Sequence, residues 1–368
     1  MDKMTMFLQK SNIQSLKPFQ RMVEKTQVMF PRVGRNESVT NRLTHSYLVA
    51  SSSEIINESI KGTGVNCDYQ HSLYNISLLH DIGHPPFGHE GAYILNDYFK
   101  NVGGFDDNNN NYVVLSKNGA FSFLTNYELA GILKYPTKLY EHQREQLLQM
   151  QTSSIASDML YFEQHGYQID KPFKRVIATE IMDEADRNTY ITHDLADFFC
   201  LGWGKAEMIE KLVEENRYSE AFINSRLYAL ISSIRYKDKN AIKETFNELR
   251  NLFNQNYYLD KRAALKFKNE ELYTLREDLF KIEYKEYIKS EHLVEIRNEA
   301  TTMFKKYIEY VINEKFYPSK TYANMILKAE SEQDKLILIR DMIAEQTDWF
   351  VINKGLSEGL TKANFLQL

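Results

Sequence analysis

The sequence predicts an all-α protein that carries one small β-hairpin and ends in a helical C-terminal lobe. Only 15 glycines and 7 prolines occur among 368 residues, so few residues interrupt helices. Along most of the chain, apolar side chains recur at the three- and four-residue spacing of amphipathic helices. Hydrophobic residues make up 43% and charged residues 26% of the chain, as in ordinary soluble globular proteins.

Three helices are predicted in the first hundred residues. The first spans about 38–60, where apolar residues recur near helical spacing. The second spans about 73–84 and must end there, because Pro85 disfavours α geometry in the residue before it. The third runs from about 89 to 100.

One β-hairpin is predicted after a loop. Two glycines and the four asparagines of 108–111 are typical of a loop. The segments 112–115 and 120–123 are rich in strand-forming residues, and Asn118-Gly119 between them is typical of a tight hairpin turn. We therefore expect two paired strands between residues 112 and 123.

Helical patterning resumes at about residue 125 and continues to the end of the chain. Helices are expected over 183–199, 224–234 and 242–253. An amphipathic stripe that predicts core packing or a subunit interface consists of Leu293, Ile296, Ala300, Met303, Tyr307 and Val311. We expect a helical core over 1–205 and a C-terminal lobe over 206–368, which packs on the core and closes the site or the subunit interface.

Composition limits the possible partners and compartment. The net charge of −5 provides no global basic field for nucleic acid, although a local basic pocket would be compatible with it. Cys67 and Cys200 are too few for a zinc cluster or a disulfide framework, which favours a reducing compartment. The sequence has no secretory signal pattern and no window near the roughly 18 apolar residues of a membrane span. A cytoplasmic protein without a membrane partner is expected.

A set of histidines and aspartates predicts a metal site. His45 lies on the first helix, His80-Asp81 ends the second, and a further aspartate lies on the helix over 183–199. Two imidazoles and two carboxylates suit Mn²⁺, Fe²⁺, Co²⁺, Ni²⁺ or Zn²⁺ and tolerate Mg²⁺. Open coordination positions would hold a water and a phosphate oxygen.

Each part of this set is weak when it is taken alone. A single histidine on an amphipathic helix is more often a packed histidine than a ligand. However, four of the nine histidines cluster here, namely His45, His80, His84 and His89. The residue types leave the fourth ligand open between Asp183, Asp186 and Asp194.

Several segments resemble known motifs. HDIGHPPFGHEGAYILNDYF resembles the signature of the dGTPase-like deoxynucleoside triphosphate triphosphohydrolases of the HD superfamily. In the same order as in that family, EKTQVMFPRVGRNESVTNRLTHSYLVA, LTNYELAGILKYP, EIMDEADRNTYITHDLADFF and RDMIAEQTDW resemble its other motifs. The resemblance covers almost the whole chain. It implies an HD-domain helical core and the hydrolysis of a dNTP to deoxynucleoside and inorganic triphosphate.

The resemblance also implies roles for individual residues. The divalent metal would be bound by His45, His80, Asp81 and Asp186, and the catalytic residues would be His89 and Asp81. The triphosphate would face Arg42, Lys134 and Tyr135. Gln27 would lie beside the deoxyribose or base, Tyr190 against the sugar and Asp194 near the 3′-hydroxyl. Asn108 matches a substrate-binding asparagine of the family in the loop before the hairpin. Asp186, Tyr190 and Asp194 are four residues apart, so they share one helical face.

The chain departs from the family pattern at three places. Ala92 stands where the family has an acid that orients His89, so Ala92→Glu is expected to raise turnover unless a neighbour such as Glu90 already orients the ring. Thr40 stands where arginine is common, and a basic residue usual between the Lys134 segment and the Asp186 helix has no clear counterpart around 152–157.

Two other functions stay open at this point. One is another HD phosphohydrolase, a nucleotidase or a phosphodiesterase. The other is a weakly active, nucleotide-binding regulatory HD protein in which Ala92 has removed the partner of the catalytic histidine. The resemblance further implies a homo-oligomer, a tetramer or hexamer, and leaves open an allosteric nucleotide, nucleic-acid binding and the preferred base.

Overall fold

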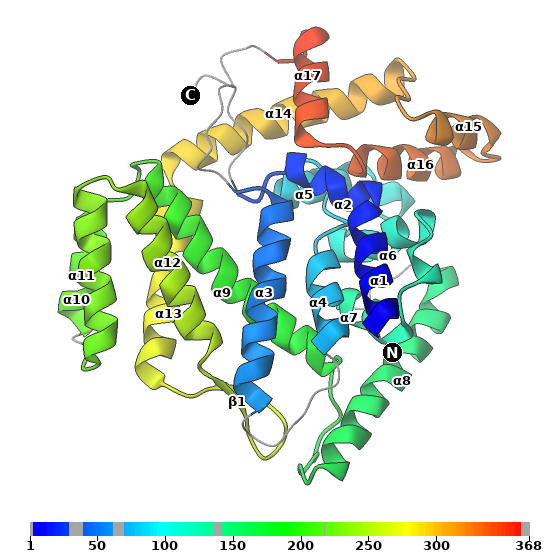
Figure 1. The fold of residues 1–368 in the computed structure, drawn as a ribbon. Coiled ribbons are helices and arrows are strands. Elements are labelled where there is room, and N and C mark those ends of the chain that lie inside the picture. Colours follow the sequence, from blue (N-terminus) through cyan, green and yellow to red (C-terminus); the bar gives the residue numbers. More distant parts are fainter. Residues whose placement is uncertain (1–2, 29–39, 62–69, 135–140, 217, 362–368) are drawn as a thin grey trace.

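The computed structural model describes residues 3–28, 40–61, 70–134, 141–216 and 218–361. In these ranges it is helical apart from one two-stranded antiparallel sheet (Figure 1). The expected all-α class with a single small hairpin is therefore confirmed. No helix in these ranges combines the length and the apolar character needed to cross a membrane.

The elements up to residue 200 are α1 (Lys3–Ser15), α2 (Lys17–Arg21), α3 (Arg42–Lys61), α4 (Gln70–Leu79), α5 (Gly88–Tyr98), α6 (Asp107–Lys117), α7 (Asn126–Ile132), α8 (Glu141–Gln164) and α9 (Ile177–Cys200). Short 3₁₀ turns lie at Met22–Glu24, Lys100–Val102 and Ala120–Ser122. The elements after residue 200 are α10 (Ala206–Asn216), α11 (Ala221–Arg235), α12 (Lys239–Asn254), β1 (Tyr257–Leu259), β2 (Leu265–Phe267), α13 (Glu270–Ile282), a π-helix (Glu283–Ile288), α14 (Glu291–Asn313), α15 (Lys320–Lys328), α16 (Glu332–Ala344) and α17 (Asp348–Ser357).

Helices α3, α4 and α9 lie side by side at the centre of the molecule (Figure 1). Apolar side chains on these helices are fully buried, as Ile56 on α3, Ile76 on α4 and Ile181 on α9 illustrate. The C-terminal half of α9 continues into a second apolar cluster, which it shares with α10 to α13. Because α9 belongs to both clusters, it fixes the position of one half of the protein relative to the other.

The last four helices form a third apolar cluster with α5 (Figure 1). Phe304 of α14 packs edge-to-face on Phe87, with ring centroids 5.2 Å apart. All six residues of the predicted amphipathic stripe are buried, so its interpretation as core packing is confirmed. The carboxylate of Asp348, at the start of α17, accepts hydrogen bonds from the backbone N–H groups of Thr26 (2.8 Å) and Phe87 (2.9 Å).

The position predicted for the hairpin was wrong. Residues 112–115 lie within α6, and 120–122 form a 3₁₀ turn; the strands that pair are β1 and β2, with Tyr257 opposite Phe267. Asp106 caps α6 by accepting a hydrogen bond from the Asn109 N–H (3.0 Å), and Gly119 ends the segment with a left-handed φ of 71°. Asn-Gly is therefore a helix-terminating signal here instead of a hairpin turn.

The four asparagines predicted as a loop lie in the first turns of α6. Asn111 accepts a hydrogen bond from the Gly83 N–H (2.6 Å) and donates one to the His80 carbonyl (2.8 Å). Asn110 donates to the Gly83 carbonyl (2.7 Å). These side chains satisfy backbone groups of the His80–Gly83 turn, and this tertiary role outweighs the local preference of asparagine for loops.

Candidate active site

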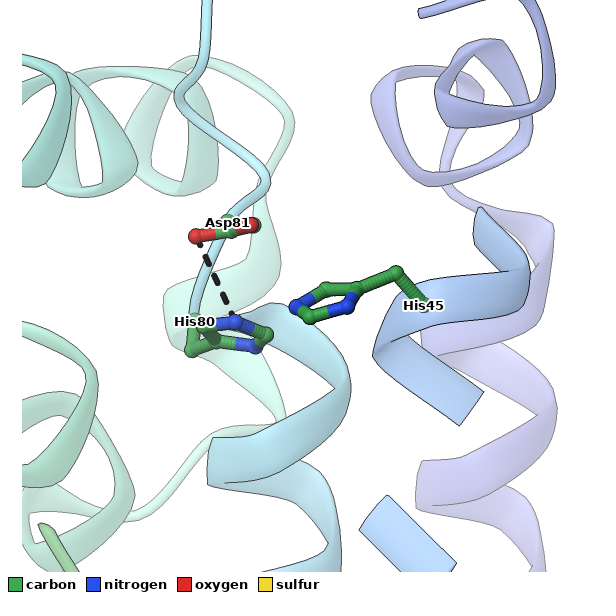
Figure 2. Close-up of side chains that lie close together, drawn as sticks. All are labelled: His45, His80 and Asp81. Carbon is green, nitrogen blue, oxygen red and sulfur yellow. Dashed lines mark ion pairs between the residues drawn. The ribbon is translucent and has the colours of Figure 1, made fainter. Parts of the chain in front are cut away.

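The centre of the candidate site is the turn that follows α4. The helix ends at Leu79, several residues before Pro85, and residues 80–83 form a tight turn. His80 begins this turn, and His45 projects toward it from α3 (Figure 2). The centroids of the two imidazole rings are 5.6 Å apart. Both histidines are almost fully buried, so the packing of α3 on α4 holds their rings in place.

Two carboxylates complete this group. Asp81 Oδ1 lies 3.3 Å from His80 Nε2 (Figure 2). Asp186 Oδ1, on α9, lies 2.9 Å from His45 Nε2 and 3.7 Å from His80 Nε2. The structure thus brings together the four residues that the sequence predicted as metal ligands.

The donor atoms of this group fit a divalent metal ion. His80 Nδ1 lies 2.7 Å from the Ser77 carbonyl, to which it donates, so Nε2 is the ring nitrogen left to bind a metal ion. This Nε2 atom is buried and makes no hydrogen bond within the described part of the chain. Ligand atoms of His45, His80 and Asp81 lie within 4.8 Å of one another. Imidazole nitrogens and ionised carboxylates that converge in this way suit Mn²⁺, Fe²⁺, Co²⁺, Ni²⁺ or Zn²⁺.

Asp81 has a second, basic partner. Arg42, fully buried at the start of α3, donates to Asp81 Oδ2 over 2.5 Å. Burial alone would raise the pKa of Asp81, but His80, His84 and Arg42 lower it well below its usual value. Asp81 is therefore an anion with one oxygen toward the histidines and the other fixed by a guanidinium.

A second cation, Lys134, lies near the aspartates of the cluster. Lys134 Nζ is 3.4 Å from Asp183 Oδ1, and the side chain is almost buried. Burial would lower the pKa of Lys134, but Asp183, Asp186 and Asp81 raise it above the ordinary value. Arg175, a basic residue that the sequence analysis missed, forms ion pairs with Asp183 and Glu180. The site therefore holds permanent positive charge.

The three candidate aspartates of α9 have different environments. Asp183 pairs with Lys134 and Arg175, whereas Asp186 reaches both histidines. Asp194 is buried, and desolvation together with the nearby Glu283 and Asp197 raises its pKa well above the ordinary value. Of the three, Asp186 alone has the geometry of a metal ligand.

His89 has a partner that the sequence did not indicate. Its Nδ1 lies 3.2 Å from Asp107 Oδ2, at the first residue of α6. The same oxygen is 3.1 Å from Nε2 of His84, whose Nδ1 in turn lies 3.5 Å from Asp81 Oδ1. Burial and the neighbouring Arg42 lower the pKa of His84 to about 4, so this ring is neutral at pH 7. Glu90, the adjacent acid that the sequence left as a poor substitute, forms no ion pair with His89 among the described residues.

Three further predicted residues lie in the described part of the chain, and a fourth does not. Pairing of the Thr26 and Asn41 backbones places Gln27 beside the start of α3, and its buried Oε1 has no hydrogen-bond partner within the described part of the chain. Tyr190 is half-buried, with its ring edge-on to Phe280 at 6.2 Å. Asn108 contacts Asp107. Tyr135 lies outside the described residues.

Comparison with known proteins identifies related sequences. Residues 42–121 match the HD domain family. The deoxyguanosinetriphosphate triphosphohydrolase-like protein of Aliivibrio salmonicida is 30% identical over 291 residues, which cover 63% of this chain and 62% of that protein. Deoxyguanosinetriphosphate triphosphohydrolase-like protein 2 of Deinococcus radiodurans is 29% identical over 240 residues, 55% of each chain. The matched region thus spans less than two thirds of the length of these curated relatives.

Among solved structures, a hypothetical protein from Aquifex aeolicus matches 94% of this chain and 66% of its own, with 14% sequence identity and a TM-score of 0.44.

Proposed function

The chain belongs to the dGTPase-like family of HD-domain proteins, and on that premise we propose that it hydrolyses deoxynucleoside triphosphates to deoxynucleoside and inorganic triphosphate. One observation supports the proposal most: His45, His80, Asp81 and Asp186 bring their ligand atoms close together, and two buried cations, Arg42 and Lys134, lie near these carboxylates. Such a site suits the phosphate oxygens of a highly charged anion.

We assign the metal to these four residues. A bound divalent ion, chosen from Mn, Mg, Co, Fe, Ni and Zn, would polarise a phosphate oxygen and lower the pKa of a bound water. The protein's own residues supply the remaining charge. Lys134 stays protonated because Asp183, Asp186 and Asp81 raise its pKa, so it is a permanent cation for the triphosphate. Arg42 fixes Asp81 and adds a second positive charge close to it.

The sugar would bind along α9. Tyr190 and Asp194 follow Asp186 by one and two helical turns on the same face, so a nucleotide whose phosphates lie at Asp186 would extend its deoxyribose toward them. We assign Tyr190 to the face of the sugar, and Asp194 to the 3′-hydroxyl. Gln27, whose buried Oε1 has no hydrogen-bond partner within the described residues, would contact the deoxyribose or the base.

In the proposed reaction, the oxygen of a water molecule bonds to the α-phosphorus, and the bond from this phosphorus to the 5′-oxygen breaks. The water releases a proton, and the leaving 5′-oxygen gains one. His89 handles a proton in this exchange, as imidazoles do near neutral pH. Its exposed ring, which is held by Asp107, is open to a ligand at the site.

Product analysis tests the proposal. Each dNTP would be incubated with the protein and Mn²⁺ or Mg²⁺, and the products separated by ion-exchange chromatography. Deoxynucleoside and triphosphate are expected with at least one dNTP, and the His45→Ala variant should form neither. A monophosphate with pyrophosphate would instead identify another HD phosphohydrolase, and nucleotide binding without any product would identify a regulatory protein.

The assembly forms part of the same proposal. We propose that the protein is a homo-oligomer, a tetramer or hexamer. Light scattering would measure its mass with and without added dNTP. An increase in turnover of one dNTP on addition of a second would reveal an allosteric nucleotide.

A further inference from the structure

We propose that Asp107 is a positioning residue that holds the His89 ring in the orientation needed for proton transfer, in place of the acid absent at residue 92. This inference rests on the proposed function, because it concerns the histidine that handles a proton there. Ala92 lies on the same helix as His89, whereas Asp107 reaches His89 from the start of α6. The orienting acid has thus moved from one helix to another.

The carboxylate of Asp107 is itself held firmly. Its Oδ1 accepts hydrogen bonds from the backbone N–H (3.0 Å) and side-chain amide (3.3 Å) of Asn108. Its Oδ2 lies 3.2 Å from His89 Nδ1 and 3.1 Å from His84 Nε2. Burial would raise the pKa of Asp107, but His84 and His89 lower it well below the ordinary value. Asp107 is therefore an anion in a fixed position.

His89, by contrast, depends on Asp107 for its orientation. The His89 side chain is 71% exposed, while that of Asp107 is only 13% exposed. Besides the Asp107 contact, the described residues give the ring an edge-to-face contact with His84 at 4.9 Å. A surface histidine with so few contacts would otherwise sample several rotamers. An ionised Asp107 favours the proton on Nδ1, which leaves Nε2 as the atom that exchanges protons with a ligand.

The backbone at Gly83 allows the start of α6, which carries Asp107, to lie close to the His80–Gly83 turn. A Cβ atom on Gly83 would lie 2.5 Å from the Asp107 carbonyl oxygen and 2.3 Å from the Asn111 nitrogen, so only glycine lets α6 reach the turn. Asn110 and Asn111 then bind the backbone of that turn. The start of α6 is thereby fixed relative to His80 and Asp81, and Asp107 with it.

The two other candidates lack this geometry. Glu90 follows His89 directly on α5 and makes no contact with it in the structure, since neighbours in a helix point in different directions. The side chain of Ala92, one turn after His89, packs against the apolar cluster of α14 to α17. Of the acids in the described part of the chain, Asp107 is the one that contacts His89.

Variants that remove the acid at residue 107 and introduce one at residue 92 test the proposal. Asp107→Ala should lower turnover of the preferred dNTP roughly tenfold or more, although by less than loss of the general acid or base itself, which costs roughly 10²–10⁴-fold. Metal content should be unchanged. Adding Ala92→Glu to Asp107→Ala should restore part of the rate, because it returns an acid to the helix that carries His89. Ala92→Gln, which has the same size without the charge, should not. In the wild-type background, Ala92→Glu should give no gain.

Rescue separates orientation from folding, because a structural defect at the start of α6 would not be repaired by a glutamate on α5. Asp107→Asn, which keeps the shape of the side chain, should lower turnover in the same direction, and Glu90→Gln should leave it unchanged. An unaltered rate in Asp107→Ala and Asp107→Asn, or equal rescue by glutamate and glutamine, would overturn the proposal.

A second readout does not depend on activity. Nitrogen chemical shifts of the His89 ring report which nitrogen carries the proton. The Nδ1–H form should dominate in the wild type and decline in Asp107→Ala. A wild-type ring protonated mainly on Nε2 would contradict the role of Asp107, even if triphosphate is formed. An Nδ1–H ring in a protein that hydrolyses no dNTP would contradict the proposed function and leave the Asp107 contact intact.

Discussion

The two ring nitrogens of His80 have different roles. Nδ1 donates to the Ser77 carbonyl at 2.7 Å, and this bond fixes the ring so that Nε2 faces Asp81 and Asp186. A buried nitrogen without a hydrogen bond is costly unless a ligand satisfies it. Two carboxylates close to it strengthen the requirement for a cation. The chemistry of this single residue therefore supports our proposal that this group binds a metal ion.

Removal of one ligand should release the metal. Asp81→Ala and His45→Ala are each expected to lower the metal content of the purified protein strongly, because each removes one of four ligands. Elemental analysis measures the metal-to-protein ratio. His292→Ala, which changes an exposed histidine beside Trp203, is the control and should keep the metal. Full metal content in both ligand variants would rule out this ligand set.

Tyr190 should set the preference for deoxynucleotides. It is half-buried and supported by Phe280, so its ring cannot move away easily from a 2′-hydroxyl beside it. Such an unfavourable pocket contact is worth about 1–3 kcal/mol. The ratio of kcat/KM for dGTP to that for GTP should therefore be high in the wild type and smaller in Tyr190→Ala. Equal kcat/KM values for the two nucleotides in the wild type would exclude this role.

At the scale of elements, α6 supports the turn that carries His80 and Asp81. Asn111 satisfies the Gly83 N–H and the His80 carbonyl, and all three residues are buried. Asn111→Ala should lower the free energy of unfolding by roughly 1–3 kcal/mol for each buried group that is left without a partner. Urea denaturation measures this loss.

The matched control is Asn118→Ala at the other end of the same helix. Its amide donates only to the Val114 carbonyl within α6, at a half-buried position. Its loss should cost under about 1 kcal/mol. Equal effects of the two substitutions would mean that Asn111 does not support the turn.

Element prediction succeeded where local and tertiary preferences agreed. Helices such as α5 and α12 are amphipathic and lie close to the expected ranges. Prediction failed at α6, where asparagines and an Asn-Gly pair indicate a loop and a turn by local preference. The side chains of Asn110 and Asn111 instead find partners in a turn that precedes them by nearly thirty residues. Contacts between residues so far apart in the sequence cannot be predicted from the residues next to them.

The same limit applies to the site. His80, Asp81 and His89 lie in one short segment, so their spacing already indicated metal chemistry. The choice of Asp186 over Asp183 and Asp194 came from the resemblance, because the three candidate aspartates of α9 carry the same chemistry and only tertiary packing separates them. Asp107 was missed because it precedes the misread asparagine run, and nothing in its local sequence connects it with His89.

At the scale of the whole molecule, Asp348 connects the last helices to the segments next to the site by hydrogen bonds. It is fully buried, and its two oxygens accept the N–H groups of Thr26 and Phe87, which belong to segments far apart in the sequence. The side chain of Lys25 adds hydrogen bonds to the His84 (2.5 Å) and Ala344 (3.1 Å) carbonyls. Through these contacts, α16 and α17 are joined to the segment that leads from the His80 turn into α5.

Loss of this connection should destabilise the protein. Asp348→Ala would leave two buried N–H groups without partners, at a cost of roughly 1–3 kcal/mol each. The midpoint of urea denaturation should fall accordingly, whereas Glu330→Ala, at an exposed position before α16, should leave it within about 0.5 kcal/mol of wild type. An unchanged midpoint in Asp348→Ala would show that the last helices are held by apolar packing alone.

We propose that the site directs water to the α-phosphorus of a dNTP. Hydrolysis of the preferred dNTP in water enriched in heavy oxygen tests it most directly, with both products analysed by mass spectrometry. Attack at the α-phosphorus should give inorganic triphosphate that carries one heavy oxygen and a deoxynucleoside that carries none. A labelled deoxynucleoside, or a labelled monophosphate or pyrophosphate in place of triphosphate, would contradict it.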